Sequence, residues 1–484
     1  MQQQSDTTMV DQALATTGAA RESEGVFAPR FRALTIGLVL VVASAAFEAL
    51  AVAATMPATT RELGGLALYG WAFSAFMLTN LVGVTLAGSA ADRYGPAQPF
   101  LLGVSLFVTG LLVAGLAPMM PVLIAARAVQ GLGAGMISSV AYVAIGRGYP
   151  EGTKARMLAM TSTAWVVPGL IGPAVAGLIT DFAGWRWVFL SLVPLPIIAA
   201  LLALPVLRRM GRPEAQPADD HSQPAPGRGA ARNAVQLAGG VGLLMAGLGQ
   251  TAQPLLAAGL AIAGVALALP ALRRMMPEGT LRAAAGMPAA IVAMCLLNLS
   301  FFGVDAFVPL ALNELRGQSI AVAGLPLTAA TLTWTTGSWV LAQIAGRASR
   351  RSVAAVGLTL VAVGIGAVIV TLLPSVTPLA GIGAWAVAGL GIGLAFTTIS
   401  LAVLENAPPG QEGKASAAMQ VASGLGTAIG TGVGGTIVGS GSTDVSAARI
   451  AIQCALMIAV ALLGALVALR IGKRPEAEAG SAGR

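Results

Sequence analysis

Residues 127–135 read RAVQGLGAG, and residues 385–393, which lie 258 positions further along the chain, read WAVAGLGIG. Six of these nine positions are identical in the two stretches. The same offset relates four further pairs of residues: Gly88 with Gly346, Arg93 with Arg351, Gly172 with Gly430, and Gly177 with Gly435. Because alanine and glycine bias alone rarely lets one offset fit several separated stretches, the chain contains an internal repeat.

The composition is that of a polytopic membrane protein. Charged residues make up 10% of the 484 residues and hydrophobic residues 56%, and the mean hydropathy is +0.81. Soluble domains carry roughly 25% charged residues, and a soluble protein as apolar as this one could not cover its surface with polar groups. The composition therefore excludes a soluble enzyme, a nucleic-acid-binding protein and a disordered chain.

Fourteen apolar runs are candidates to cross a bilayer, for which about 20 residues are needed. Because the bilayer core holds no water to satisfy backbone polar groups, each run is expected to be a helix. The runs cover residues 34–57, 68–90, 99–117, 120–144, 157–181, 187–207, 233–251, 254–272, 286–311, 319–346, 352–374, 377–403, 415–439 and 446–472.

The repeat groups these helices into two six-helix bundles with an extra pair between them. The bundles and the pair each contain an even number of spans, so the bundles share one orientation about an axis along the membrane normal, and the substrate path is expected between them. The predicted units are a cytoplasmic tail (1–30), the first bundle (31–207), a cytoplasmic linker (208–232), the extra pair (233–272), the second bundle (286–472) and a cytoplasmic tail (473–484).

Basic residues support this arrangement. With the N-terminus in the cytoplasm, 23 of the 28 lysines and arginines fall on the cytoplasmic side, as the positive-inside rule expects. Arg127 falls inside a span, and four arginines fall outside: Arg61, Arg186, Arg316 and Arg449. This placement explains the net charge of +8 without nucleic acid and predicts that both termini are cytoplasmic. Arginines on both flanks of the extra pair favour 14 spans over 12.

Five motifs follow one another along the chain. They are Glu48 through Pro57; Gly88–Asp92–Arg93–Tyr94–Gly95; Arg127–Gln130–Gly131–Gly133–Gly135; Gly169–Gly172–Pro173–Gly177; and Trp185–Arg186–Trp187–Phe189 with Pro194. In this order they resemble the major facilitator superfamily, most like its 14-helix drug:proton antiporter branch, over about residues 30–472. The resemblance implies an all-α membrane protein with two pseudo-symmetric six-helix bundles and two additional linker helices, 14 transmembrane helices in all.

This chain departs from the family pattern at two places. Glu48 stands where the branch usually has aspartate, and the stretch Pro96–Ala97–Gln98–Pro99 replaces the basic residues that usually follow Gly95. The lock between the two halves that the loop signature implies is therefore expected to be weaker here, or to depend on Asp92 and Arg93 alone.

Two carboxylates, Glu48 and Asp305, lie well inside predicted spans, where an ionised acid costs several kcal/mol. Glu48 precedes Pro57 by about ten residues, or roughly 14 Å of helix, which is near the midplane. Asp305 maps to within one residue of Glu48, since 48 plus 258 is 306. We expect both acids to couple proton flow to a conformational change. The alternative is an acid at the outer rim, and it is stronger for Asp305.

Arg127 is the only base inside a span, and its repeat mate is Trp385, so no matching site is expected in the second half. The resemblance implies that Arg127 takes part in proton transfer or holds water near the first helix. The alternative is an arginine that snorkels to a nearby helix end. Gly131 and Gly135 are expected to form a packing face rather than a nucleotide loop, because they lie in a span.

The resemblance also implies a set of gating residues: Gly88, Asp92, Arg93, Gly95, Gly169, Gly172, Pro173 and Gly177. Asp92 would dock on the positive N-terminus of a helix of the other half, near Gly413–Lys414; a solvated loop acid is the alternative. Pro173 would bend its helix, and the resemblance implies that this bend closes the site on the side away from export.

Polar and aromatic side chains in the spans are candidates to line a cavity, although each is more often a packing residue. They are Trp71, Asn80, Gln130, Trp165, Asn298, Trp334, Gln343 and Gln420. Cys295 and Cys454 lie in apolar stretches, and the single histidine, His221, lies in the linker. No metal site and no cofactor is therefore expected, and the proton gradient is the expected energy source.

The leading interpretation is a proton-coupled secondary active exporter of lipophilic, cationic small molecules that works by alternating access. A lipid or natural-product exporter of the same fold is the alternative, while a nutrient symporter or a membrane enzyme fits less well. The expected partners are the lipid bilayer, the small-molecule substrate and protons, with a monomer as the expected state. Arginine outnumbers lysine 25 to 3, a bias found in GC-rich bacteria, so a multi-pass protein of the bacterial cytoplasmic (inner) membrane is expected.

Overall fold

The computed structural model describes residues 25–211, 226–250, 253–344, 348–408, 411–441 and 444–472. Most of the predicted N-terminal tail, the predicted C-terminal tail and the centre of the predicted linker, with His221, lie outside the described residues, as does Gly346.

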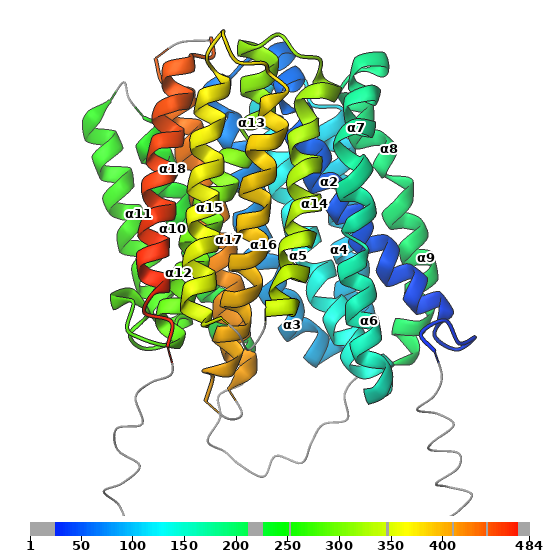
Figure 1. The fold of residues 1–484 in the computed structure, drawn as a ribbon. Coiled ribbons are helices and arrows are strands. Elements are labelled where there is room, and N and C mark those ends of the chain that lie inside the picture. The colour runs from blue at the N-terminus through cyan, green and yellow to red at the C-terminus, as the bar shows by residue number, and fades with distance from the viewer. Residues whose placement is uncertain are drawn as a thin grey trace, which may run out of the picture.

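The first half of the chain forms one helical bundle (Figure 1). Its elements are α2 (Arg32–Leu63), η1 (Leu66–Leu68), α3 (Tyr69–Tyr94), α4 (Ala97–Gly115), α5 (Met120–Gly148), α6 (Glu151–Thr163), α7 (Val166–Ala183), α8 (Arg186–Leu192) and α9 (Pro194–Arg209). α6 and α7 together make one crossing, as do α8 and α9. α2 continues through Pro57 to Leu63, so the predicted end of this span at residue 57 is six residues too early.

The extra pair and the second bundle follow. The pair is α10 (Pro226–Gly249) and α11 (Pro254–Met275), and α10 begins inside the predicted linker. The second bundle consists of η2 (Thr280–Arg282), α12 (Met287–Asp305), α13 (Val308–Leu310), η3 (Ala311–Leu315), α14 (Ile320–Ile344), α15 (Arg350–Thr371), α16 (Ala380–Glu405), α17 (Glu412–Val438) and α18 (Ala447–Ala468). α12, α13 and η3 together make one crossing.

Twelve segments of the described chain are long and apolar enough to cross a membrane. α10 and α14 are not among them, because α10 carries Arg228 and Arg232 and α14 is rich in threonine. Both nevertheless run alongside the twelve in the bundle (Figure 1). The predicted all-α membrane fold is confirmed, and the predicted 14 spans correspond to the twelve segments together with α10 and α14.

The repeated glycines pack in the same way in both halves. A Cβ at Gly131 or Gly135 of α5 would meet the backbone of α3, and a Cβ at Gly389 or Gly393 of α16 would meet the backbone of α14. Small residues at this spacing let two membrane helices approach closely. The predicted packing role of the glycine runs is thus confirmed, and it fixes α5 and α16 at equivalent places in the two bundles.

Polar contacts join the two halves near one end of the molecule. We call the end where α2 ends and α3 begins the upper end, as drawn in Figure 1, and the opposite end the lower end. Near the upper end, the Tyr69 hydroxyl of α3 donates to the carbonyl oxygen of Ala306 at 2.8 Å. Arg61 of α2 forms an ion pair with Glu314 of η3 at 2.7 Å. These contacts join the halves across residues more than 200 positions apart.

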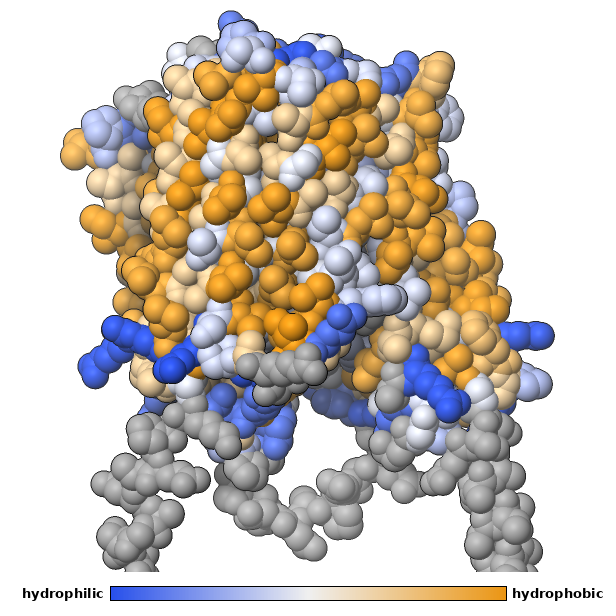
Figure 2. Space-filling model, in the orientation of Figure 1, coloured by the Kyte–Doolittle hydropathy of each residue, from blue (hydrophilic) through white to orange (hydrophobic). Residues whose placement is uncertain are grey.

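Hydrophilic and apolar side chains are separated on the molecular surface. In the view of Figure 2, the strongly hydrophilic side chains gather at the two ends, and an apolar band separates them. The upper-end arginines are held by nearby acceptors: Arg61 by Glu314, Arg186 by Glu62, Arg316 by the carbonyls of Leu373 and Val376, and Arg449 by the carbonyl of Val438. These four side chains therefore have structural partners at the end with fewer basic residues.

Candidate functional site

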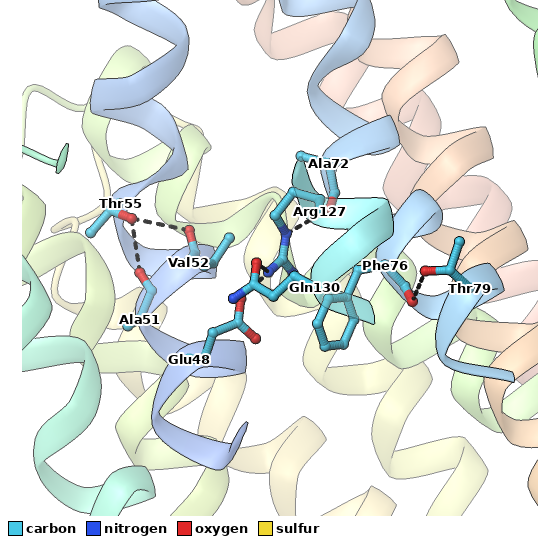
Figure 3. Close-up of polar contacts among 9 residues, drawn as sticks. All are labelled: Glu48, Ala51, Val52, Thr55, Ala72, Phe76, Thr79, Arg127 and Gln130. Atoms are coloured by element: carbon cyan, nitrogen blue, oxygen red, sulfur yellow. Dashed lines mark hydrogen bonds and ion pairs between the residues drawn. The ribbon is translucent and has the colours of Figure 1, made fainter. Parts of the chain in front are cut away.

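The first bundle contains a buried ion pair. Glu48 is residue 17 of the 32 residues of α2, and its side chain is 0% exposed. Its Oε1 accepts a hydrogen bond from Nη1 of Arg127 on α5 (Figure 3). Arg127 is buried as well, so it does not snorkel to a helix end. Charges removed from water in this way require a partner and further hydrogen bonds.

Arg127 is also anchored independently of Glu48. Its Nε donates to the carbonyl oxygen of Ala72 on α3 at 3.1 Å, and its Nη1 donates to Oε1 of Gln130 at 2.8 Å. Its guanidinium carbon lies 4.3 Å from the centre of the Phe76 ring, a favourable cation–π distance. These three contacts would keep Arg127 in place even if Glu48 lost its charge.

Two polar atoms beside Arg127 have no hydrogen-bond partner in the part of the chain that the structure describes. Oε2 of Glu48 and Nε2 of Gln130 are buried and have no hydrogen-bond partner among the described residues. A buried polar atom without a partner is costly, so such atoms are places where a proton or a polar ligand would be stabilised. Glu48 faces α5 within its own bundle and does not face lipid (Figure 3).

The second bundle holds an equivalent acid. Nε1 of Trp385 on α16 donates to Oδ1 of Asp305 at 2.8 Å. Trp385 is the repeat mate of Arg127, and Asp305 lies one position before the repeat mate of Glu48. The sequence gives no second base at the position of Arg127; the structure places an uncharged hydrogen-bond donor, Trp385, at that position beside the acid. An indole N–H donates a hydrogen bond as a guanidinium does, but it brings no charge.

The span that contains Asp305 is longer than the sequence pattern predicted. The helical segment that contains it continues through α13 and η3 to Leu315, ten residues further along the chain. The sequence pattern ended this span at residue 311, which placed Asp305 too near the end. Its side chain is half-buried, and the ion pairs of the described residues do not include it.

Ring contacts extend from Trp385, the donor to this second acid, through an aromatic cluster of Phe301, Phe302, Trp334, Trp385 and Phe396. Phe301 stacks on Trp385 with ring centres 5.0 Å apart and meets Trp334 edge-on at 5.9 Å. Trp334 in turn contacts Phe302 and Phe396. Phe302, Trp334 and Phe396 are half-buried. Trp334 is the repeat mate of Phe76, the ring beneath Arg127, so an acid, a donor and an aromatic ring recur in both bundles.

The glycines of α7 lie between the two bundles. A Cβ at Gly177 would meet the backbone of Ala321 on α14, and a Cβ at Gly169 would meet the side chain of Thr331. Gly172 instead faces Phe47 and Leu50 of α2, at 3.7 Å or more. Pro173 lies between these glycines inside α7. This stretch closes the seam between the halves in the upper half of the molecule.

A comparison with protein families identifies the fold. The model of the Major Facilitator Superfamily matches residues 36–431 and, in a second match, residues 290–483. The chain belongs to the major facilitator superfamily. It is accordingly a membrane transporter and not an enzyme.

Several relatives within the superfamily carry names that refer to drug efflux. A protein of Mycobacterium tuberculosis named "Probable multidrug-efflux transporter" is 27% identical over 409 residues, which are 81% of this chain and 85% of the relative. The "Multidrug transporter protein MdtP" of Bacillus subtilis is 30% identical over 168 residues, 35% of this chain and 31% of the relative. The crystal structure of a peptide transporter, at 14% identity, covers 94% of this chain and 96% of that chain with a TM-score of 0.68, which shows the shared fold.

The loop signature of the superfamily, Gly88–Asp92–Arg93–Tyr94–Gly95, lies at the lower end. The structure gives Asp92 a different partner from the expected one. Asp92 forms an ion pair with Arg147 of α5 in its own bundle, at 2.9 Å, rather than docking on the start of α17 near Gly413–Lys414. The described contacts between the halves lie towards the upper end, which leaves Asp92 to pair locally. Gly95 ends α3 with φ 82°, a conformation that favours glycine.

The other residues of the signature also make their contacts within the first bundle. Gly88 contacts Ser139 of α5, and the Arg93 guanidinium lies 5.1 Å from the ring of Tyr94. Gly169 and Gly177 of the α7 motif lie in the upper half of the molecule, because α7 ends at the upper end. That the bend at Pro173 closes the site on the side away from export stays a prediction.

A second lower-end ion pair mirrors the first with its charges exchanged. Arg350 of α15 pairs with Glu405 of α16 at 2.8 Å. Under the 258-residue offset, Arg350 corresponds to Asp92 and Glu405 corresponds to Arg147. The two bundles therefore carry opposite charges at equivalent positions of their lower ends.

The candidate cavity residues have different surroundings. Gln130 belongs to the Arg127 cluster, Trp334 to the aromatic cluster, and buried Asn298 bonds Met294 and Ser423 within the second bundle. Trp71 packs against the extra helix pair, so it does not face the centre. Asn80 is half-buried, and Trp165, Gln343 and Gln420 are exposed. Among the described residues, no group of three or more His, Cys, Asp or Glu side chains could hold a metal ion.

Proposed function

We propose that this transporter exports lipophilic, cationic small molecules in exchange for protons by alternating access. The names of its relatives support drug efflux as the type of transport. The buried pair of Glu48 and Arg127 carries the proposal of proton coupling. We further propose that it works as a monomer in the cytoplasmic membrane of a bacterium, with the lower end and both termini in the cytoplasm.

Glu48 is the proposed proton carrier. A proton on Glu48 would remove the Coulomb attraction to Arg127, while Ala72, Gln130 and Phe76 hold the guanidinium where it is. The consequence of protonation would thus fall on α2, whose upper end bears Arg61 and its contact with the second bundle. Protonation in the middle of α2 would in this way change the balance between closed and open upper ends.

Asp305 is the proposed second acid. Its carboxylate has an uncharged donor, Trp385, where Glu48 has a guanidinium. An ionised Asp305 therefore carries a net negative charge into an aromatic surrounding, which suits a lipophilic cation or a proton. Rings such as Phe302 and Trp334 would contact the apolar and cationic parts of such a substrate.

Transport by purified protein in liposomes with an imposed pH gradient tests this function. The probe is ethidium, a lipophilic cation, and the variants are wild type, Glu48→Gln, and Glu62→Gln as a control. Glu62 is an exposed acid on the same helix, bound to Arg186 and Trp185 at the upper end. We expect proton-driven ethidium transport by wild type and the control, and no uphill transport by Glu48→Gln.

Two results would contradict the proposal. Uphill transport with proton movement in Glu48→Gln would remove Glu48 as the coupling group. Wild-type protein that moves no ethidium or other lipophilic cation under either direction of the pH gradient would overturn drug:proton exchange as a whole.

A further inference from the structure

In the part of the chain that the structure describes, the two bundles meet along two seams, and a further helix covers one of them. The first seam, between α3 and α17, lies beneath the extra helix pair. Leu237 and Met245 of α10 form one buried cluster with Leu78 of α3 and Leu425 of α17. Met77 of α3 packs against the same cluster. α10 therefore shields this seam from the lipid.

The second seam, between α7 and α14, has no such cover among the described residues, and the α7 side of it becomes exposed in its lower part. Residues four apart on a helix share a face, so Gly177, Pro173 and Gly169 of α7 form one stripe, and the stripe continues to Trp165 and Val166. The three upper positions touch α14. Trp165 and Val166, by contrast, are 47% and 36% exposed. The stripe is thus covered by α14 from Gly169 upwards and exposed below it.

Proline explains where the opening begins. Pro168 has no N–H, so the carbonyl of Ala164 loses the bond that a continuous helix would make. The chain accordingly breaks between α6, which ends at Thr163, and α7, which begins at Val166. Below this break the wall of the seam is α6 instead of α7, and Figure 1 shows α6 at the lower right, beyond the lower end of α14.

The α14 side of the opening is hydroxyl-rich. Thr335 follows Thr331, which lies against Gly169 of α7, by one helical turn and is half-buried. Thr336 is exposed near it, and Trp339 is 72% exposed. Figure 2 shows a paler, less apolar strip on this face of the molecule, between apolar flanks. Tryptophan and hydroxyl groups suit a depth where apolar chains meet polar headgroups.

We infer that the lower part of the α7–α14 seam is a lateral entrance. Amphiphilic substrates dissolved in the membrane leaflet at the lower end enter there, and the extra helix pair blocks the equivalent route between α3 and α17. Trp334, next to Thr335, leads from this entrance to the aromatic cluster beside Asp305. The inference rests on the proposed export function and adds the route by which its substrate arrives.

The repeat supplies a matched pair of positions for the test. Thr335 of α14 corresponds to Met77 of α3, since 335 minus 258 is 77. Single-cysteine variants Thr335→Cys and Met77→Cys are made with Cys295 and Cys454 replaced by alanine. Each is treated in liposomes with a dodecyl methanethiosulfonate, which reaches thiols from the bilayer, and mass spectrometry measures the modification.

Transport is then measured with two cations. One is trimethylammonium-diphenylhexatriene, which dissolves in the membrane, and the other is water-soluble methyl viologen. We expect the Thr335→Cys protein to be modified and to lose transport of the membrane-dissolved dye while it keeps any transport of methyl viologen that the unmodified variant shows. We expect the Met77→Cys protein to stay unmodified and to keep transport of the dye.

The entrance is overturned if Thr335→Cys is not modified, if the modified protein still transports the dye at its former rate, or if Met77→Cys is modified and blocked equally. If modified Thr335→Cys lost transport of both cations, the proposed entrance would also be overturned, because the modification would then block transport in general. Unmodified protein that transports no dye at all would instead contradict the proposed export function.

Discussion

At the scale of single residues, the buried pair of Glu48 and Arg127 predicts a non-additive effect on stability. Glu48→Gln leaves the Arg127 charge buried among neutral acceptors, and Arg127→Gln leaves Glu48 without its cation. Loss of one partner of a buried pair costs roughly 3–5 kcal/mol, whereas the double variant removes both charges. We expect the double variant to unfold at a higher temperature than the less stable single variant, as measured by thermal unfolding in detergent. Additive destabilisation would show that the pair does not act as a unit.

Asp305 predicts a selective effect on substrates. Asp305→Asn keeps an oxygen that can accept the hydrogen bond from Trp385 but removes the charge that faces the aromatic cluster. We expect efflux of lipophilic cations to fall strongly and efflux of uncharged lipophilic compounds to change little. Parallel efflux assays with ethidium and a neutral dye measure the ratio. An equal fall for both would assign Asp305 to proton coupling alone.

The sequence identifies these acids but not their partners. Glu48, Asp305 and Arg127 are recognisable because each is an ionisable residue within an apolar run. The pairing of Glu48 with Arg127 joins positions 79 apart, and only the packing of α2 against α5 produces it. The repeat offset relates Trp385 to Arg127, but the sequence shows only that a base is missing at this position. That the indole N–H donates to Asp305 instead follows from the packing of α16 against α12.

At the scale of helices, α7 supplies a matched test of the closed seam. A Cβ at Gly177 would collide with the backbone of Ala321, whereas the nearest atom to a Cβ at Gly172 is 3.7 Å away, in the Phe47 ring. We therefore expect Gly177→Ala to favour opening of the upper end and Gly172→Ala to have little effect. The measurement is the rate at which a membrane-impermeant maleimide labels a cysteine placed at Thr331, beneath the closed part. Equal labelling of the two glycine variants would contradict this account.

Helix boundaries show which elements the pattern could predict. Apolar runs located the spans, because only a helix satisfies its own backbone in lipid. They missed the continuation of α2 past Pro57, since proline is usually read as a stop although α2 passes through it here. They also missed the break between α6 and α7, where hydropathy stays high and only Pro168 marks the change. Hydropathy therefore predicts the number of membrane-crossing helices more reliably than the positions at which they bend.

At the scale of the whole molecule, pseudo-symmetry is broken in three places that bear on transport. The second half has the indole of Trp385 at the position where the first half has the guanidinium of Arg127. The acid and the base of the lower-end ion pair Asp92–Arg147 have exchanged positions in Arg350–Glu405. Among the described residues, the extra helices cover the α3–α17 seam alone. A symmetric pair of bundles would have two equal acids and two equal side entrances. In the described part of this chain, Glu48 is paired with a guanidinium, Asp305 is bound by an uncharged donor, and the extra helices cover the α3–α17 seam but not the α7–α14 seam.

The orientation of the molecule in the membrane predicts the outcome of a labelling experiment on the two ends of α15. Ala348 and Ser375 are both exposed, and they flank α15 at its lower and upper ends respectively. Because basic residues are concentrated at the lower end, the positive-inside rule places Ala348 in the cytoplasm. In intact cells, a membrane-impermeant maleimide should label Ser375→Cys and should label Ala348→Cys only after permeabilisation, in a background without native cysteines. The reverse labelling pattern would show that the molecule has the opposite orientation in the membrane. That result would also contradict the proposed direction of proton and substrate movement.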